Sequence, residues 1–198
     1  MADAAPAAPL LLASRSPQRR SILEQLGIPF EVVAPSYEEE LARGMDAVEL
    51  VRLHAREKAR SVADGAGDRP VLGVDTEVVL DGRIYGKPRD AGDAEAMLEA
   101  LGGKTHLVLS GLCLVTPGWE VVEHESTHVR FRPLTARDLA TYVWTGEWEG
   151  RAGAYAIQGR GAALVAGIEG DYLNVVGLPG SLLVRLLAQR FPGTYGFG

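Results

Sequence analysis

Cysteine is nearly absent from this sequence: Cys113 is the single one in 198 residues, and it lies in the apolar run 112–115. A cysteine in such surroundings is expected to be a buried, reduced thiol rather than a nucleophile or a metal ligand. Because a reduced thiol is typical of a reducing compartment, the sequence predicts a cytoplasmic protein.

Long hydrophobic runs and an excess of basic residues are also missing. No segment approaches the roughly 20 apolar residues that a membrane span needs, and residues 1–13 contain Asp3 and no basic segment, which argues against a secretory signal. The 26 acidic residues outnumber the 20 basic ones and give a net charge of −6. This balance argues against nucleic acid or a membrane as a partner, so an anionic ligand has to be held by local groups.

Several common catalytic motifs do not occur. The sequence contains no Gly-x-x-x-x-Gly-Lys-Ser/Thr phosphate loop, no Gly-x-Gly-x-x-Gly after the first apolar run, no Gly-x-Ser-x-Gly elbow and no His-Glu-x-x-His zinc helix. Their absence argues against the familiar ATPase, dehydrogenase and hydrolase classes.

The apolar residues that are present follow an alternation of short strands and helices. Strands are predicted at 9–14, 29–34, 70–75, 77–80, 106–115, 120–131, 162–168 and 171–176, and helices at 17–26, 46–63, 91–101, 135–144 and 179–190. Asp81-Gly82 between two apolar runs is typical of a tight hairpin, so part of the sheet should be antiparallel. We therefore expect an α/β fold with a mixed, twisted sheet and flanking helices. It should form one domain over residues 1–198, with 1–8 as a flexible N-terminal extension.

The junction after the first predicted strand has the composition of a phosphate site. Ser14 and Ser16 end the apolar run, Pro17 opens the next helix, and Arg19 lies in its first turn. Free backbone N–H groups, the helix dipole and a fixed cation would meet there, which predicts that both serines and Arg19 bind a polyphosphate substrate. Taken alone, the same residues fit an ordinary capped turn equally well.

Charged residues in three other segments could complete such a site. Asp75 follows the apolar run 71–74 and could accept a proton from water or hold a divalent cation, although a turn-capping role fits that segment equally well. Lys87 lies on a turn constrained by Pro88 and could clamp a phosphate. One member of the acidic run 38–40, normally a solvated surface, could share a metal with Asp75.

Together these segments resemble the Maf family of nucleoside triphosphate pyrophosphatases, from about residue 9 to residue 190. The matching motifs are Leu-Ala-Ser-Arg-Ser-Pro-Gln-Arg at 12–19, Glu39, Glu-Lys-Ala at 57–59, Asp-Thr at 75–76, Gly-Lys-Pro at 86–88, Tyr-Ala-Ile-Gln-Gly at 155–159 and Asn-Val-Val-Gly-Leu-Pro at 174–179. The resemblance implies the mixed α/β fold shared with inosine triphosphate pyrophosphatases, with a catalytic cleft between two lobes, and a homodimer.

The resemblance also implies a reaction and the residues that perform it. A nucleoside triphosphate would be hydrolysed between its α- and β-phosphates, giving a monophosphate and pyrophosphate with the help of a divalent metal cation, Mg²⁺ or Mn²⁺. The roles carried to matching positions are Asp75 as proton acceptor for the attacking water, Arg19, Lys58 and Lys87 as phosphate-binding groups, and Glu39 with Asp75 at the metal. This set suits the chemistry, since phosphoanhydride hydrolysis needs charge neutralisation and positioning more than a covalent intermediate.

Three positions bear on the base that is preferred, and one departs from the family pattern. Thr76 and Gln158 match the branch that acts on dTTP and UTP, whereas Gln18 replaces the arginine usual in the family. A glutamine amide could still pair with a pyrimidine, since it offers both a donor and an acceptor. We therefore expect dTTP and UTP as substrates. Modified purine triphosphates such as 7-methyl-GTP or ITP, and a nucleotide-binding regulator of cell division and septum formation, remain as alternatives.

Overall fold

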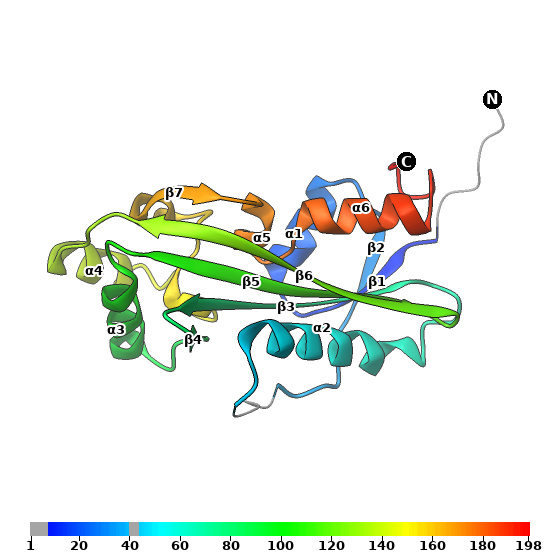
Figure 1. Cartoon of the computed structure of the whole chain (residues 1–198), viewed down its shortest axis with the longest axis horizontal. Coiled ribbons are helices and arrows are strands. Elements are labelled where there is room, and N and C mark those ends of the chain that lie inside the picture. Colours follow the sequence, from blue (N-terminus) through cyan, green and yellow to red (C-terminus); the bar gives the residue numbers. More distant parts are fainter. Residues whose placement is uncertain (1–7, 40–43) are drawn as a thin grey trace.

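A seven-stranded mixed sheet runs through the computed structural model, which describes residues 8–39 and 44–198 (Figure 1). Its strands are β1 (Leu10–Ala13), β2 (Phe30–Val33), β3 (Val71–Leu80), β4 (Arg83–Tyr85), β5 (Thr105–Thr116), β6 (Trp119–Phe131) and β7 (Val165–Glu169). The order is β2-β1-β3-β5-β6-β7, with β4 paired to β3. β1 pairs in parallel with β2 and β3, and the other pairs are antiparallel, which confirms the predicted mixed sheet.

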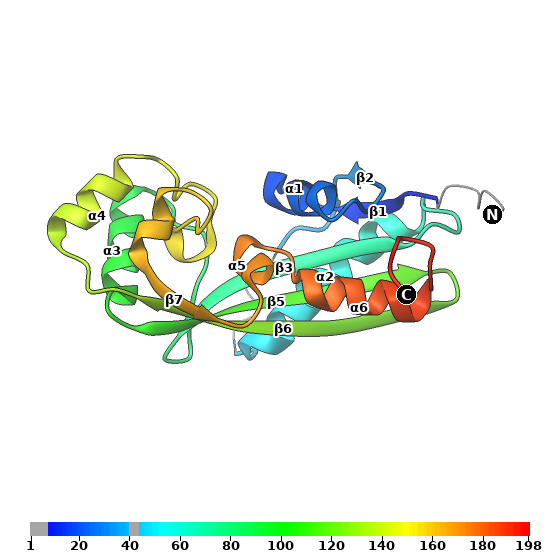
Figure 2. The same cartoon turned by 90° about the horizontal axis from the view of Figure 1, so that it is seen from above.

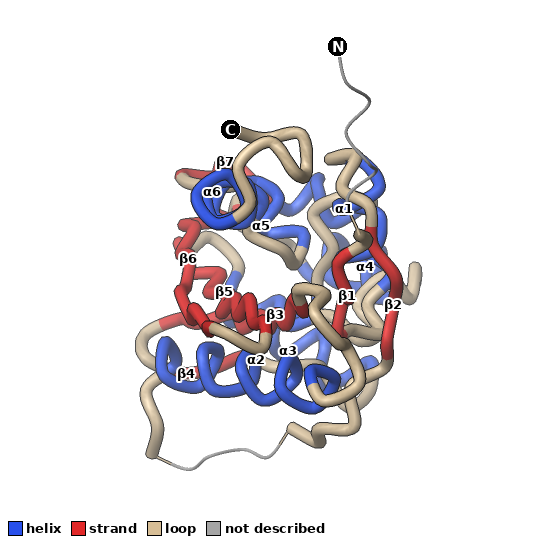
Figure 3. The backbone as a smooth tube through the Cα atoms, turned by 90° about the vertical axis from the view of Figure 1, so that its right-hand side faces the viewer, coloured by secondary structure: helices blue, strands red, loops and turns tan. Residues whose placement is uncertain are grey.

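Helices lie against both faces of this sheet. They are α1 (Pro17–Gln25), α2 (Ala47–Ala63), α3 (Ala91–Leu101), α4 (Ala136–Val143), α5 (Tyr172–Val176) and α6 (Gly180–Arg190), with short 3-10 helices η1 (Ala152–Ala154) and η2 (Arg160–Leu164). Helix α2 runs along one face of β3 and β5, and α1, α5 and α6 lie on the opposite side (Figures 1 and 3). The helices predicted from periodicity are confirmed to within a residue at each end.

Two hydrophobic cores meet at the middle of β3. Leu72 and Val74 belong to a core with β1, α1 and α6, whereas Val78 and Leu80 belong to a second core with α3, α4 and η1. Figure 2 shows the two groups of helices at opposite ends of the molecule, with β3, β5 and β6 passing between them. The polar residues 75–77 therefore lie where one core ends and the next begins.

Helix α2 approaches the sheet unusually closely because two facing strand positions are glycine. A Cβ on Gly73 would collide with the carbonyl oxygen of Ala55, and a Cβ on Gly111 with that of Val51. Small, fully buried side chains on the face of the helix toward the sheet, including Ala55 and Ala59, allow the same approach. The backbone of the helix therefore packs directly against the backbone of β3 and β5.

The hairpin between β3 and β4 forms as predicted. Asp81 and Gly82 both adopt positive φ, at 52° and 76°, as a two-residue hairpin turn requires. This turn reverses the chain and brings the segment that carries Lys87 back beside β3.

The predicted strands differ from the structure at three places. Residues 70–75 and 77–80 form one uninterrupted strand, and the first part of 162–168 is the 3-10 helix η2. Residues 171–176 form helix α5 rather than a strand, because the Asp171 side chain accepts the Leu173 N–H at 2.8 Å as an N-cap and Gly177 ends the helix at φ 130°. A short apolar run does not by itself distinguish a strand from a buried helical turn.

The predicted environment of Cys113 is confirmed. The side chain is fully buried on β5, and burial raises the pKa of its thiol to about 12, so the thiolate does not form near neutral pH. None of the helices in the described parts of the chain has the length and apolar character that crossing a bilayer requires. The predicted N-terminal extension, 1–8, lies outside the described residues except for Ala8.

The close approach of α2 predicts the effect of adding one methyl group. Gly111→Ala should lower the free energy of unfolding by about 3 kcal/mol, because the new Cβ meets backbone atoms that no side-chain rotation can move. Chemical denaturation measures this loss. Gly118→Ala is the matched control, since a Cβ at that exposed turn meets nothing within 4 Å. Equal stability of the two variants would contradict the tight contact.

Candidate active site

A cleft of about 1000 Å³ opens beside the middle of β3, between the two cores. It is lined by every residue for which the sequence predicts a role at the site. These residues are Ser14, Ser16, Gln18, Arg19, Glu39, Lys58, Asp75, Thr76, Lys87 and Gln158. The fold therefore brings together side chains from α1, α2, β3 and four loops.

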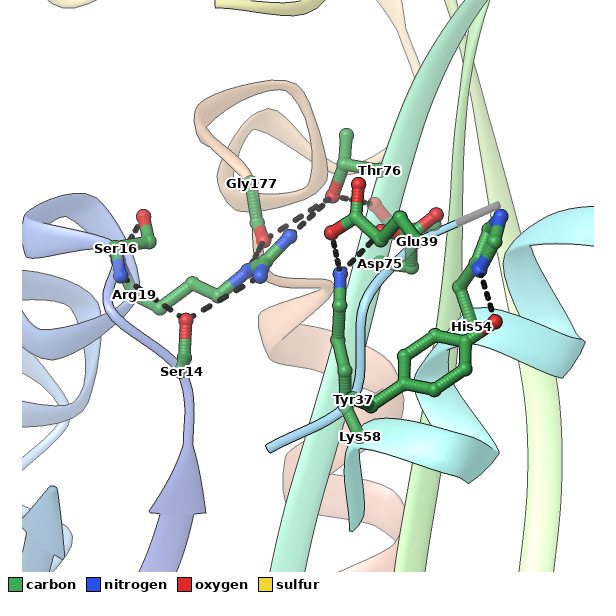
Figure 4. Close-up of polar contacts among 11 residues, drawn as sticks. Ser14, Ser16, Arg19, Tyr37, Glu39, His54, Lys58, Asp75, Thr76 and Gly177 are labelled. Carbon is green, nitrogen blue, oxygen red and sulfur yellow. Dashed lines mark hydrogen bonds and ion pairs between the residues drawn. The ribbon is translucent and has the colours of Figure 1, made fainter. Parts of the chain in front are cut away.

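Lys58 and Asp75 form the buried centre of the cleft. The Nζ of Lys58 donates to Oδ1 of Asp75 at 2.6 Å and lies 2.5 Å from Oε1 of Glu39 (Figure 4). Lys58 is 6% exposed and Asp75 4%. The close packing of α2 against Gly73 positions this contact, because Lys58 on α2 and Asp75 on β3 project from two backbones that lie in close contact.

Arg19 reaches the other side of β3 from the first turn of α1. Its guanidinium donates to the carbonyl oxygen of Gly177 at 2.8 Å, to Oγ1 of Thr76 at 3.2 Å and to Oγ of Ser14 at 3.3 Å (Figure 4). All three acceptors are neutral, so the guanidinium charge is fixed in direction without a direct ion pair. Burial lowers the pKa of Arg19, against the opposing effect of Asp75 and Glu39, but a guanidinium stays charged at physiological pH.

The start of α1 has the predicted capped form. Ser16 is the N-cap, with its Oγ accepting the Arg19 N–H, and Pro17 is the first helical residue. The Ser16 N–H in turn donates to Oγ of Ser14 at 3.1 Å. The two serines are thus part of the turn that orients Arg19, in addition to lining the cleft.

Two glutamates of the cleft differ in the state of their carboxyl groups. For Glu39, burial acts to raise the pKa, but the hydrogen bond and charge of Lys58 outweigh it and hold the pKa below its usual value. For Glu77, burial raises the pKa to about 7, and the neighbouring charges of Asp75 and Glu39 act in the same direction. Lys58 forms direct ion pairs with Glu39 and Asp75, whereas the charges of Lys87 and Lys58 lower the pKa of Glu77 by less than burial raises it.

The three residues predicted to select the nucleobase have different surroundings in the structure. The Thr76 hydroxyl is engaged by Arg19, by Ser110 at 2.9 Å and by the Gly177 carbonyl at 3.3 Å. Gln18 accepts a hydrogen bond from Ser16 at 3.0 Å, and Gln158 is exposed in the loop between η1 and η2. Their role in base selection stays a prediction.

The structure adds residues that the motifs did not single out. His54, buried on α2, contacts the Tyr37 hydroxyl through Nδ1 at 2.9 Å (Figure 4). His54 lies four residues before Lys58, and this spacing would have placed both side chains on the same face of the predicted helix. Tyr37 lies in a loop, where no such periodicity could have identified it. Glu77, two residues after Asp75 on one strand, had a period-two signal. Arg151 lines the cleft from the loop between α4 and η1.

The donor set suits a hard cation such as Mg²⁺ or Mn²⁺. Oδ2 of Asp75 and Oε2 of Glu77 are both buried and have no hydrogen-bond partner among the described residues. Among residues 8–39 and 44–198, no three His, Cys, Asp or Glu side chains converge as a closed metal cage. Mg²⁺ is usually bound by one or two carboxylates together with substrate phosphates and water, so an open site fits this metal.

Buried carboxylates beside fixed cations, in a cleft between two lobes of a mixed α/β fold, define a site for a phosphorylated ligand. Comparison with known proteins agrees with this class. Residues 9–190 match the family model described as Maf-like protein, and the chain belongs to this family.

Similar curated proteins cover nearly the whole chain. A dTTP/UTP pyrophosphatase of Symbiobacterium thermophilum is 49% identical over 91% of this chain and 93% of its own length. One of Moorella thermoacetica is 49% identical over 90% and 93%, respectively. Among solved structures, the Ham1 protein of Staphylococcus aureus is 14% identical, with a TM-score of 0.46 over 63% of this chain and 72% of that one.

The buried charge cluster predicts a stability change that is independent of any ligand. Lys58→Met should lower the free energy of unfolding by about 3 kcal/mol, because it leaves the buried carboxylate of Asp75 beside that of Glu39 without a cation. Urea denaturation measures the loss, and the double variant with Asp75→Asn should recover part of it.

Lys104→Met is the matched control for this substitution. Lys104 is exposed, so its removal should change the stability by less than about 0.5 kcal/mol. A Lys58→Met variant as stable as this control would contradict a structural role for the pair.

Proposed function

We propose that this protein hydrolyses the α–β phosphoanhydride of a nucleoside triphosphate, releasing a nucleoside monophosphate and pyrophosphate. The observation that carries the proposal is the convergence of Arg19, Lys58 and Lys87 with Asp75 in one cleft. The similar proteins named dTTP/UTP pyrophosphatase support the same reaction.

Asp75 is suited to accept the proton of the attacking water. Its Oδ1 is held by Lys58, which fixes the carboxylate, while Oδ2 has no hydrogen-bond partner in the part of the chain that the structure describes. In the reaction, water loses a proton to Asp75 as its oxygen bonds to the α-phosphorus. The bond from that phosphorus to the bridging oxygen breaks, and pyrophosphate leaves with its electron pair.

Arg19 and Lys87 are suited to bind the phosphates. Arg19 is held by neutral acceptors and retains a positive charge not neutralised by direct ion pairing, which attracts phosphate oxygens. Lys87 is exposed at the cleft on the turn after β4. Lys58 differs from both, because its charge is already shared between two carboxylates. Its role is to hold Asp75 in position.

A divalent metal cation, Mg²⁺ or Mn²⁺, completes the proposed site, with Glu39 and Asp75 as its predicted ligands. When bound, such a cation offsets the negative charge that grows on the phosphates. We also infer a cytoplasmic location, which the buried, reduced state of Cys113 supports. A homodimer is proposed from the family resemblance alone.

The preferred bases are proposed to be those of dTTP and UTP. The names of the similar proteins support this choice, as do Thr76 and Gln158. Gln18 favours a second candidate, a pyrophosphatase for modified purine triphosphates such as 7-methyl-GTP or ITP, because it replaces the arginine usual in the family. A regulator of septum formation that only binds nucleotides would not need a buried proton acceptor such as Asp75 beside the bound phosphates.

A substrate panel tests the reaction and the base preference together. With Mg²⁺ present, dTTP and UTP should yield monophosphate and pyrophosphate faster than 7-methyl-GTP, ITP or the other common triphosphates.

Asp75→Asn should lower the turnover by at least roughly 10²-fold while nucleotide binding persists, since the amide cannot accept the proton. Pyrophosphate release and calorimetric binding measure the two effects. A tenfold or greater preference for 7-methyl-GTP or ITP, on the order of 1.4 kcal/mol, would replace the pyrimidine assignment and leave the reaction intact.

Adjacent arginines at the start of α1 provide a matched pair. Arg19→Ala should raise KM and lower kcat, because its guanidinium faces the cleft and meets phosphates whose charge grows during the reaction. Arg20→Ala should leave both within about twofold, since the Arg20 side chain is exposed and forms an ion pair with Glu24 on the surface of the helix. Steady-state kinetics on both variants decide the point, with circular dichroism to verify the fold. A larger defect in Arg20→Ala would contradict this register of the motif.

A further inference from the structure

Glu77 is a carboxylate in the cleft to which the proposed reaction assigns no role. It follows Asp75 by two residues on β3, so both side chains project from the same face of the strand. The carboxyl group of Glu77 has no hydrogen bond or ion pair within the described residues, although its Oε2 is buried. A Cβ added to Gly86 would lie 3.7 Å from this oxygen, which places Glu77 beside the turn that carries Lys87.

Asp75 presents a second oxygen of the same kind. The side chain is 4% exposed, and its Oδ2 is buried without a hydrogen-bond partner in residues 8–39 and 44–198. Leaving buried polar oxygens unpaired costs free energy, so a ligand that binds both would remove the cost. Lys58 is not the partner of these two oxygens, because its contacts are with Oδ1 of Asp75 and with Glu39.

We propose that Glu77 and Oδ2 of Asp75 together bind the divalent metal cation of the proposed pyrophosphatase. The proposal rests on that function, which brings a triphosphate into the same cleft. Two carboxylates facing phosphates repel them unless a cation lies between. Two carboxylates plus phosphate oxygens and water form the ligand set that Mg²⁺ prefers. Glu77 thus joins the predicted metal ligands, and Glu39 retains its ion pair with Lys58.

Binding of Mn²⁺ alone tests the assignment without catalysis. Free Mn²⁺ is measured by electron paramagnetic resonance while it is added to the nucleotide-free protein. Glu77→Gln should raise the Kd for Mn²⁺ by roughly tenfold or more, because an amide is a much weaker ligand than a carboxylate. Mn²⁺ should raise the Tm of the wild type, as expected for a ligand that binds the native state, and should raise that of Glu77→Gln much less.

Glu149→Gln is the matched control. Glu149 lines the same cleft from the opposite lobe and is exposed, so this variant loses the same charge from the same cleft. Its Kd for Mn²⁺ should stay within about twofold of wild type, because an exposed, distant charge is screened. An equal loss in both variants would show a general electrostatic effect and overturn the assignment.

Two further outcomes decide the proposal. Glu77→Asp keeps the charge and shortens the side chain by one methylene, so its Kd for Mn²⁺ should lie between those of wild type and Glu77→Gln. If Glu77→Gln binds Mn²⁺ as the wild type does, Glu77 is a neutral acid or a structural group, and the assignment fails. Failure of the proposed function is seen separately, as a wild type that releases pyrophosphate from no triphosphate.

Discussion

The contact between the backbone of α2 and the two glycines of the sheet is the constraint on which the site depends. Gly73 and Gly111 let the helix lie almost directly on β3 and β5. Lys58 therefore reaches Asp75 and Glu39 with little exposure of its charged end. A helix held even slightly further away would leave a buried carboxylate without its cation, so packing and electrostatics are set by the same pair of residues.

Charge in the cleft is divided between two roles by the partners of each cation. Lys58 is enclosed by carboxylates, whereas Arg19 is fixed by hydroxyl and carbonyl oxygens. In the proposed function, Lys58 orients the proton acceptor Asp75 and Arg19 keeps its charge for an incoming anion. This division explains how a protein of net charge −6 can bind a polyphosphate. The positive potential is local and directional, and the acidic remainder of the surface does not need to contribute.

The sequence predicted which residues line the cleft better than it predicted the strands near the end of the chain. Several of its motif residues lie on well-patterned elements, as Lys58 on α2 and Asp75 on β3, or beside a proline that constrains the backbone, as Arg19 after Pro17 and Lys87 before Pro88. Helix α5 was missed because its apolar run is short, and its identity depends on the cap of Asp171 and on the buried amide of Asn174, which donates to Val108 and Thr127. The contact between Tyr37 and His54 arises only from the tertiary fold.

The course of β3, β5 and β6 through both lobes has a mechanical consequence. In many two-lobed enzymes a flexible linker is the hinge, and the lobes move as separate bodies. Here β3 carries residues of both hydrophobic cores, and its ladder with β5 continues past residues 75–77 without interruption. A rotation of one core relative to the other therefore requires a change in the twist of the sheet. The elastic stiffness of the strands resists such a rotation, whereas the loops that line the cleft are not bound by the ladder.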